Sequence, residues 1–207
     1  MRWPPIGDCS PRLAERGIEV SYETIRQWCG KFGPEYARKL KRRGGPRGDI
    51  WHLDEVFVKI RGQLHYLWRA IDQDGDTIDI LVQKRRNTRA AARFFRKLLK
   101  GERAAPRLIV TDKLRSYSAA KRDVIPSVPQ CTKQYANNRA EVSHQRTRQR
   151  ERKMRRFKSQ GQAQRFLAVH GQVINILVVG RHHLKARNYR CVRERAFDQW
   201  QQIVGIR

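Results

Sequence analysis

Acidic residues are scarce in this chain of 207 residues: 19 Asp and Glu stand against 46 Lys and Arg, which gives a formal net charge of +27. This scarcity predicts a polyanionic partner. Nucleic acid fits better than acidic metabolites, because neutralising phosphates releases condensed counterions. A membrane surface fits less well, since the sequence shows no lipidation signal and no lysine-rich amphipathic helix with a clean apolar face.

Long apolar runs and paired cysteines are also missing. The longest apolar run, Ile176 to Val179, is far too short to cross a bilayer. The N-terminal stretch MRWPPIGDCSP has no apolar core of signal-peptide length. No C-x-x-C pair occurs, which argues against a zinc finger, a disulfide framework and an oxidising compartment. The four scattered cysteines are Cys9, Cys29, Cys131 and Cys191.

The histidines and one acidic loop resemble metal sites only superficially. The six histidines show neither H-E-x-x-H nor a zinc-finger spacing, so we assign them no metal. The loop Asp72–Asp76 begins like a calcium loop, but Thr77 stands where the sharp turn needs glycine and Gln83 where a bidentate Glu belongs. This loop therefore predicts a hairpin turn.

Residues 1–37 predict a small helical module. Pro11 and Gly17 bound one short segment, and Ser21 is a suitable N-cap for a second helix over YETIRQWCGKFG. Two short helices with a polar outer face are typical of a DNA-binding helix-turn-helix, although an ordinary helical hairpin remains equally open. In the DNA-binding interpretation, Arg26 and Gln27 lie at or near base edges, with Lys31 on the same outer side.

Residues 38–49 predict a basic linker. Six basic residues, three glycines and a proline lie between residues 38 and 48, with no acid. The alternatives are a solvated tether and a segment that follows DNA phosphates through Arg42 and Arg43.

Residues 50–160 predict an α/β catalytic core. Three strands in a meander, a helix, a strand and a second helix are the order of a ribonuclease-H-like domain, a mixed sheet flanked by helices. The expected elements are strands at 51–60, 64–71, 77–82 and 108–110, with helices at 87–100 and about 115–122. Further helices are expected at about 138–157, 162–178 and 190–203, and residues 161–207 are interpreted as a helical extension of the core.

Three carboxylates stand at the ends of, or inside, these elements. Asp112 directly follows a buried strand, where ligand sites form in α/β sheets, but a plain turn Asp is equally open. Asp54 lies inside an apolar strand, where a buried carboxylate needs a partner or a metal, and strand alternation cannot choose between it and Glu55. Glu141 follows Asn138 at capping-box spacing, so a structural cap is the stronger local interpretation.

With these motifs in view, the chain resembles the DDE transposases of the bacterial insertion-sequence-six family. The matching stretches are SYETIRQW, WHLDEVFVKIRGQLHYLWRAIDQDGDTIDILVQKRRNTRAA, LIVTDKLRSYSAA and YANNRAEVSHQRTRQRERKMRRFKS. The resemblance implies a ribonuclease-H-like fold in which Asp54, Asp112 and Glu141 are the catalytic, metal-binding triad, with Asp54 preferred over Glu55. Three acids from separate elements suit two Mg²⁺ ions, with Mn²⁺ as the alternative metal.

The resemblance also implies the reaction and the partners. Metal-activated water would cut DNA at the element's ends, and the freed 3′-hydroxyl would attack target DNA, replicatively and with cointegrate formation. The partners would be terminal inverted repeats, target DNA and a second copy in a homodimer or larger synaptic assembly. We expect a cytoplasmic bacterial protein associated with the nucleoid.

One further basic segment and two alternatives complete the expectations. Nine of the twenty residues from Arg139 to Lys158 are basic, which predicts phosphate contacts by Arg146, Arg150 and Lys153 in preference to a solvated face. The N-terminal stretch departs from the family pattern, so a truncated, non-catalytic DNA-binding regulator of transposition remains the main alternative. A host ribonuclease-H-like nuclease is the other.

Overall fold

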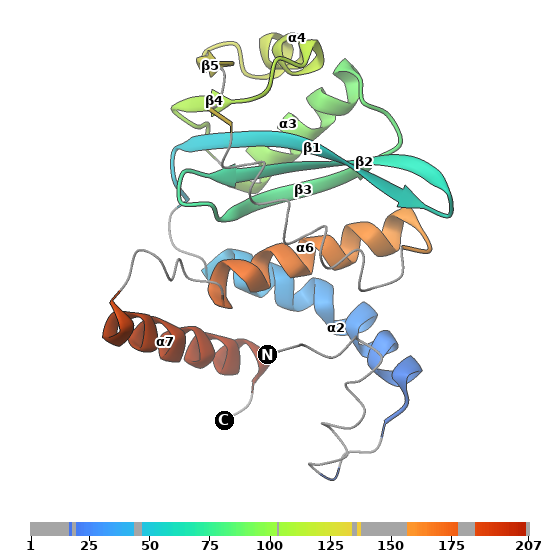
Figure 1. Ribbon diagram of the computed structural model, residues 1–207, viewed down its shortest axis with the longest axis vertical. Helices are drawn as coiled ribbons and strands as arrows, with labels where there is room; N and C mark the ends of the chain where they lie inside the picture. Colours follow the sequence, from blue (N-terminus) through green and yellow to red (C-terminus); the bar gives the residue numbers. More distant parts are fainter. Residues whose placement is uncertain are drawn as a thin grey trace.

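Five strands form one mixed sheet in the order β3-β2-β1-β4-β5 (Figure 1). The strands are β1 (Ile50–Ile60), β2 (Gln63–Asp72), β3 (Thr77–Gln83), β4 (Leu108–Val110) and β5 (Gln130–Cys131). β1, β2 and β3 are antiparallel neighbours, whereas β4 runs parallel to both β1 and β5. The computed structural model describes residues 17, 20–43, 47–102, 104–133, 136–137, 157–177 and 185–205, with the side chains of Tyr22, Ile25, Arg26 and Val204 excepted.

Two tight turns fix the register of the meander. The β1–β2 turn is Arg61–Gly62, and both residues have positive φ, 50° and 79°, as a two-residue hairpin turn of matching twist requires. In the β2–β3 turn, one carboxylate oxygen of Asp72 accepts hydrogen bonds from the backbone N–H groups of Asp74 (3.0 Å) and Asp76 (2.9 Å). The predicted hairpin turn is therefore confirmed at the acidic loop.

Helices α3 (Thr88–Glu102) and α4 (Arg115–Val124) cover one face of the sheet (Figure 1). The apolar stripe predicted for α3 buries Phe94 and Phe95 completely, against Trp68 of β2 and Tyr117 of α4. Asn87 caps α3 by accepting a hydrogen bond from the N–H of Ala90 at 3.0 Å. This aromatic core holds β1, β4 and α4 in fixed relative positions.

Helix α6 (Gln160–Leu177) covers the opposite face and the free edge of β3. Leu167 packs with Leu67 and Ile80 in a second apolar cluster. Amide oxygens of α6 also accept backbone N–H groups of β3: Asn175 from Thr77, and Gln164 from Val82, both at 2.8 Å. These bonds satisfy an edge strand that would otherwise be open to pairing with another chain.

Helix α2 (Tyr22–Arg43) corrects two predictions. Ser21 is its N-cap as predicted, since its hydroxyl accepts the N–H of Thr24 at 3.1 Å. The helix does not stop at Gly33, however, and residues 38–43 are helical although we predicted a linker there. The cause is packing against α6: Leu40 is 2% exposed, and a Cβ on Gly33 would lie 3.2 Å from a methyl carbon of Val169. This burial outweighs the helix-disrupting effect of Pro34.

The remaining elements follow the predictions closely, apart from β5. The two-residue strand β5 was not predicted, and α7 (Ala186–Val204) starts four residues earlier than expected. The first helix of the predicted helix-turn-helix, and the predicted helix at 138–157 apart from Phe157, lie outside the described residues. The strand and helix order confirms the predicted ribonuclease-H-like fold. Among the described residues, no helix has both the length and the apolar character needed to cross a bilayer.

Candidate active site

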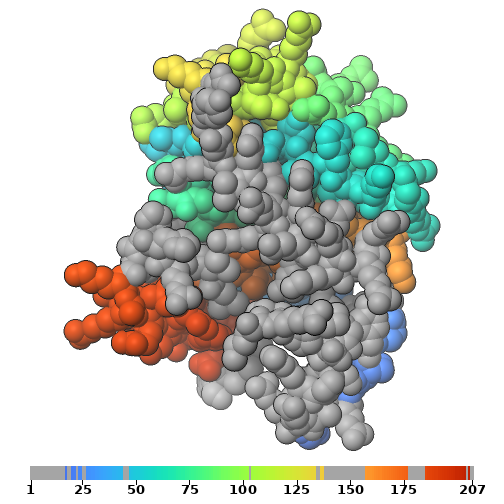
Figure 2. Space-filling model, in the orientation of Figure 1, coloured from blue at the N-terminus to red at the C-terminus, as the bar shows by residue number. Residues whose placement is uncertain are grey.

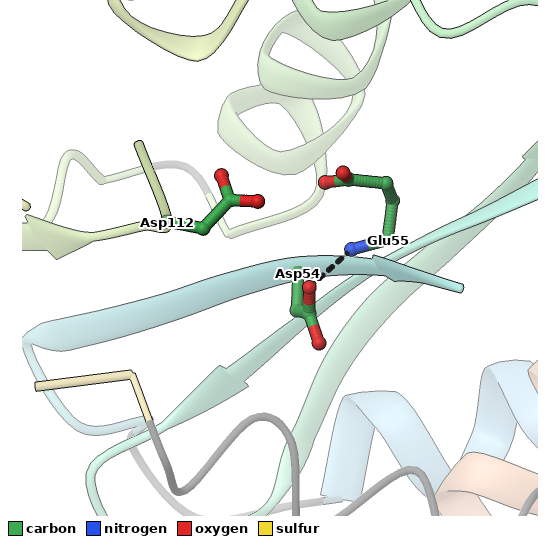
Figure 3. A group of neighbouring side chains, drawn as sticks. All are labelled: Asp54, Glu55 and Asp112. Carbon is green, nitrogen blue, oxygen red and sulfur yellow. Dashed lines mark hydrogen bonds between the residues drawn. The ribbon is translucent and has the colours of Figure 1, made fainter. Parts of the chain in front are cut away.

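Three carboxylates gather at the centre of the sheet. Asp54 and Glu55 come from β1, and Asp112 follows the end of β4 (Figure 3). Each offers a carboxylate oxygen, and these three oxygens lie within 4.8 Å of one another. Asp54 and Asp112, two of the three predicted catalytic residues, are thus brought together, and Glu55 joins them.

The two β1 carboxylates leave the strand on opposite faces, as the alternation predicted. Figure 3 shows Glu55 on the side of Asp112 and Asp54 on the other side of β1, with an Asp54 oxygen accepting the backbone N–H of Glu55 at 2.8 Å. They still meet because β4 pairs with β1 only from Ile50 to His52. Beyond His52 β4 no longer pairs with β1, and Asp112, which follows β4, lies near the carboxylates that leave both faces of β1.

Asn137 lies beside this part of β1. It is 7% exposed, and its side-chain amide donates a hydrogen bond to the backbone oxygen of Leu53 at 2.8 Å. The chain therefore returns to β1 directly beside Asp54, after leaving the sheet at β5.

The side chain of Glu55 is 2% exposed, against 40% for Asp112. Arg86, which lies between β3 and α3, donates from Nε to a Glu55 oxygen at 2.6 Å, and its NH2 group contacts the same oxygen. Burial and the negative charge of Asp112 raise the pKa of Glu55 to about 7, while Tyr117 and Arg86 act in the opposite direction. Glu55 is thus a buried carboxyl that is held by the guanidinium of Arg86.

Asp112 is half-buried and tied to the start of the following turn. One of its oxygens accepts the backbone N–H of Leu114 at 3.0 Å, and the other lies 3.7 Å from the NH2 group of Arg86. Burial is the largest cause of a raised pKa at Asp112, and the charge of Asp54 raises it further. Arg86 therefore bridges two carboxylates that repel each other.

The predicted DNA-contacting residues are not brought to this site in the part of the chain that the structure describes. Four lie exposed on α2, which packs against α6 (Figure 1): Gln27, Lys31, Arg42 and Arg43. The side chain of Arg26 and residues Glu141, Arg146, Arg150 and Lys153 lie outside the described residues, so their roles stay predictions.

Sequence reasoning missed Arg86 and Tyr117. Arg86 stands in the basic run Lys84-Arg85-Arg86, which has the composition of an ordinary solvated turn. Tyr117 lies in the stretch LIVTDKLRSYSAA, five residues after Asp112, and is completely buried beneath the carboxylates with its pKa raised by burial and by Glu55. Its place in that stretch, close to Asp112, was the one available signal.

A family described as "DDE domain" matches residues 48–180, the sheet, α3, α4 and α6 included. The transposase for insertion sequence-like element IS431mec of Staphylococcus aureus (strain Mu50 / ATCC 700699) is 33% identical over 142 residues, covering 66% of this chain and 63% of that protein. The S. aureus transposase for insertion sequence element IS257 in transposon Tn4003 is 32% identical with the same coverage. The chain belongs to the DDE transposases of the insertion-sequence-six family, and the resemblance seen in the sequence is confirmed.

Two further points define the extent of these similarities. The chain spans 63% of the length of these two curated relatives. Among solved structures, the catalytic domain of Mos1 mariner transposase aligns with a TM-score of 0.47 at 14% identity, covering 84% of this chain and 93% of that one.

The pKa of Glu55 predicts how stability depends on pH. In the folded chain Glu55 holds its proton up to about pH 7, against 4.5 for the ordinary group. Between these two values the folded state binds more protons than the unfolded state does. The protonated Glu55 therefore adds to the free energy of unfolding, in full below pH 4.5, and this contribution is lost as the pH rises to about 7. In urea titrations with EDTA, Glu55→Gln should flatten the fall across this window. An unchanged slope would contradict the assignment.

Proposed function

We propose that this chain is a transposase that cuts DNA at the ends of an insertion sequence and joins the freed 3′-hydroxyl to target DNA, replicatively. The observation that carries the proposal is the meeting of Asp54, Glu55 and Asp112 carboxylate oxygens within 4.8 Å in a DDE domain. Such a cluster is costly to assemble without a cation, because burial and mutual repulsion both oppose the charged forms.

The residues present fit a divalent cation. The donors are all carboxylate oxygens, which Mg²⁺ prefers, and the single described guanidinium among them, Arg86, is shared between Glu55 and Asp112. Asp54 and Asp112 would hold the metal together with Glu141. When bound, two Mg²⁺ or Mn²⁺ ions activate the attacking oxygen and stabilise the leaving oxygen of an in-line phosphoryl displacement.

The position of Asn137 supports Glu141 as the third ligand. Asn137 is fixed on the backbone of Leu53, next to Asp54, and Glu141 follows it by four residues. Even a fully extended chain spans at most about 14 Å over four residues, so the Glu141 backbone stays within that distance of Asn137. A limit of this size is compatible with a Glu141 carboxylate at the cluster.

Arg86 should compete with the metal. Replacing Arg86 with glutamine removes a positive charge 3.7 Å from an Asp112 oxygen, so Mn²⁺ affinity should rise by about tenfold, equivalent to about 1.4 kcal/mol. Mn²⁺ titration followed by electron paramagnetic resonance measures this. Arg85→Gln is the matched control, because Arg85 is exposed and its substitution removes the same charge one residue earlier. Equal affinities in the two variants would contradict competition by Arg86.

DNA is the expected partner on charge grounds, since the chain carries a net charge of +27. End recognition is proposed for Arg26, Gln27 and Lys31, and phosphate contacts for the basic segment between Arg139 and Lys158. Bringing two ends together further implies a dimer or larger assembly.

The test is strand transfer by the purified chain. It would be mixed with labelled DNA carrying the terminal repeats that flank its gene, in Mg²⁺ and in EDTA. Nicking and joining that appear only with Mg²⁺ are expected. Binding without cleavage in either condition would replace this proposal with the regulatory, non-catalytic alternative.

A further inference from the structure

A basic hollow lies between α3 and α4, apart from the carboxylate cluster. Its volume is about 370 Å³. Three of its lining residues are arginines on one stripe of α3, at spacings of four and three residues: Arg89, Arg93 and Arg96. Thr88, Ala92 and Asp123 complete the lining. The hollow therefore presents three guanidinium groups against one carboxylate.

The arginines of the hollow are held in different ways. Arg93 donates from NH1 to the side-chain oxygen of Gln83 at 3.3 Å, and Gln83 in turn donates to the backbone oxygen of Ala90 at 2.9 Å. Gln83 is 5% exposed, so one side of the Arg93 guanidinium is fixed by a buried group. Arg96 is paired with Asp123 at 2.9 Å, and both side chains are 63% exposed. Arg93 is thus positioned by the fold, and Asp123 offsets one of the three charges.

We infer that this hollow binds the sugar-phosphate backbone of duplex DNA, without reading its sequence. Guanidinium groups match phosphate oxygens in a planar, two-bond geometry, and a row of them along a helix matches a row of phosphates. Seven residues of helix span about 10.5 Å, the distance from Arg89 to Arg96. One strand places a phosphate about every 3.4 Å along the duplex axis, so α3 lying along that axis would span about three phosphates.

The start of α3 connects the hollow to the carboxylate cluster along the chain. Arg86 contacts Glu55 and lies 3.7 Å from Asp112, and it precedes Thr88, the first residue of α3, by two positions. DNA that follows α3 toward its N-terminus therefore arrives at the catalytic carboxylates. This inference deepens the proposed function by assigning it a second DNA-contacting surface, on the opposite face of the sheet from α6.

The salt dependence of DNA binding tests the hollow. Binding of a short duplex of random sequence would be followed by fluorescence anisotropy in EDTA, from about 50 to about 200 mM salt. The logarithm of the binding constant falls linearly with the logarithm of the salt concentration. Arg89→Gln combined with Arg93→Gln should make this slope shallower by about 1.8, or about 0.9 for each lost phosphate contact. Asp123→Asn should act in the opposite direction and tighten binding several-fold, because it removes the one carboxylate and releases Arg96.

A matched pair on α7 controls for bulk charge. Arg187→Gln combined with Arg190→Gln removes the same charge from exposed positions, and Figure 2 shows α7 and α4 at opposite ends of the molecule. An equal loss of slope in the α7 pair, or weaker binding by Asp123→Asn, would overturn the inference. The binding experiment is run in EDTA, where no cleavage occurs, so a failure of strand transfer would not affect the evidence for the hollow. Conversely, an unchanged slope would not affect the proposed transposase activity.

Discussion

Replacing Asp112 with asparagine is expected to abolish DNA cleavage, with a loss of at least about 10³-fold. Metal-assisted charge stabilisation contributes several kcal/mol to such reactions, and each 1.4 kcal/mol is about a factor of ten in rate. Asn removes the charge that attracts the cation but keeps an oxygen able to accept the N–H of Leu114, which Asp112 now accepts at 3.0 Å. The measurement is nicking of labelled terminal-repeat DNA in Mg²⁺.

The thermal midpoint of the same variant separates chemistry from folding. Burial raises the pKa of Asp112, which means that the folded state disfavours its charge, so a neutral amide should leave the midpoint unchanged or raise it. Asp49→Asn is the control, because Asp49 is an exposed aspartate of the same domain paired only at the surface with Arg107. Cleavage at the normal rate by the Asp112 variant would remove Asp112 from the site, whereas loss in both variants would indicate a general effect of lowered charge.

The elements built on local apolar patterns were predictable from the sequence. The stripe containing Phe94, Phe95 and Leu98 predicted α3, and the alternation around Asp54 and Glu55 correctly predicted that they face opposite sides of β1. Such patterns depend only on the helix and strand periods, which the sequence contains directly.

What the sequence did not show depends on tertiary contacts. The continuation of α2 past Pro34 follows from the burial of Leu40 and from the close approach of Gly33 to α6, which is distant in sequence. Asp54, Glu55 and Asp112 can meet because β4 is only three residues long and pairs with β1 only as far as His52. The helix and strand propensities of the local sequence predict neither the length of α2 nor the end of the β1–β4 pairing.

Arg86 is the clearest example of a site residue that only the fold identifies. It lies 31 positions from Glu55 in the chain, and the two meet because the strand order β3-β2-β1 returns the end of β3 to the neighbourhood of β1. In the sequence it is one of three consecutive basic residues, and nothing distinguishes it from Arg85. The choice between Asp54 and Glu55 likewise rests on the family, because the geometry places both within reach of Asp112.

Replacing Glu141 with glutamine is expected to remove both cleavage and strand transfer, again by at least about 10³-fold, while DNA binding is retained. The reason is that the proposed function assigns the third carboxylate to Glu141, which follows Asn137, the residue anchored beside Asp54, by four positions. Glu151→Gln is the matched control, since Glu151 is the other acid between Arg139 and Lys158 and undergoes the same change.

The competing role for Glu141 makes a different prediction in the same experiment. If Glu141 only caps a helix begun at Asn138, glutamine can replace it in the capping box, and the variant should cleave as well as Glu151→Gln does. Joining of labelled ends in Mg²⁺, with binding measured in parallel in EDTA, distinguishes the two. Retained cleavage would leave Asp54, Glu55 and Asp112 as the metal-binding set, and the third carboxylate would then be Glu55, held in place by Arg86.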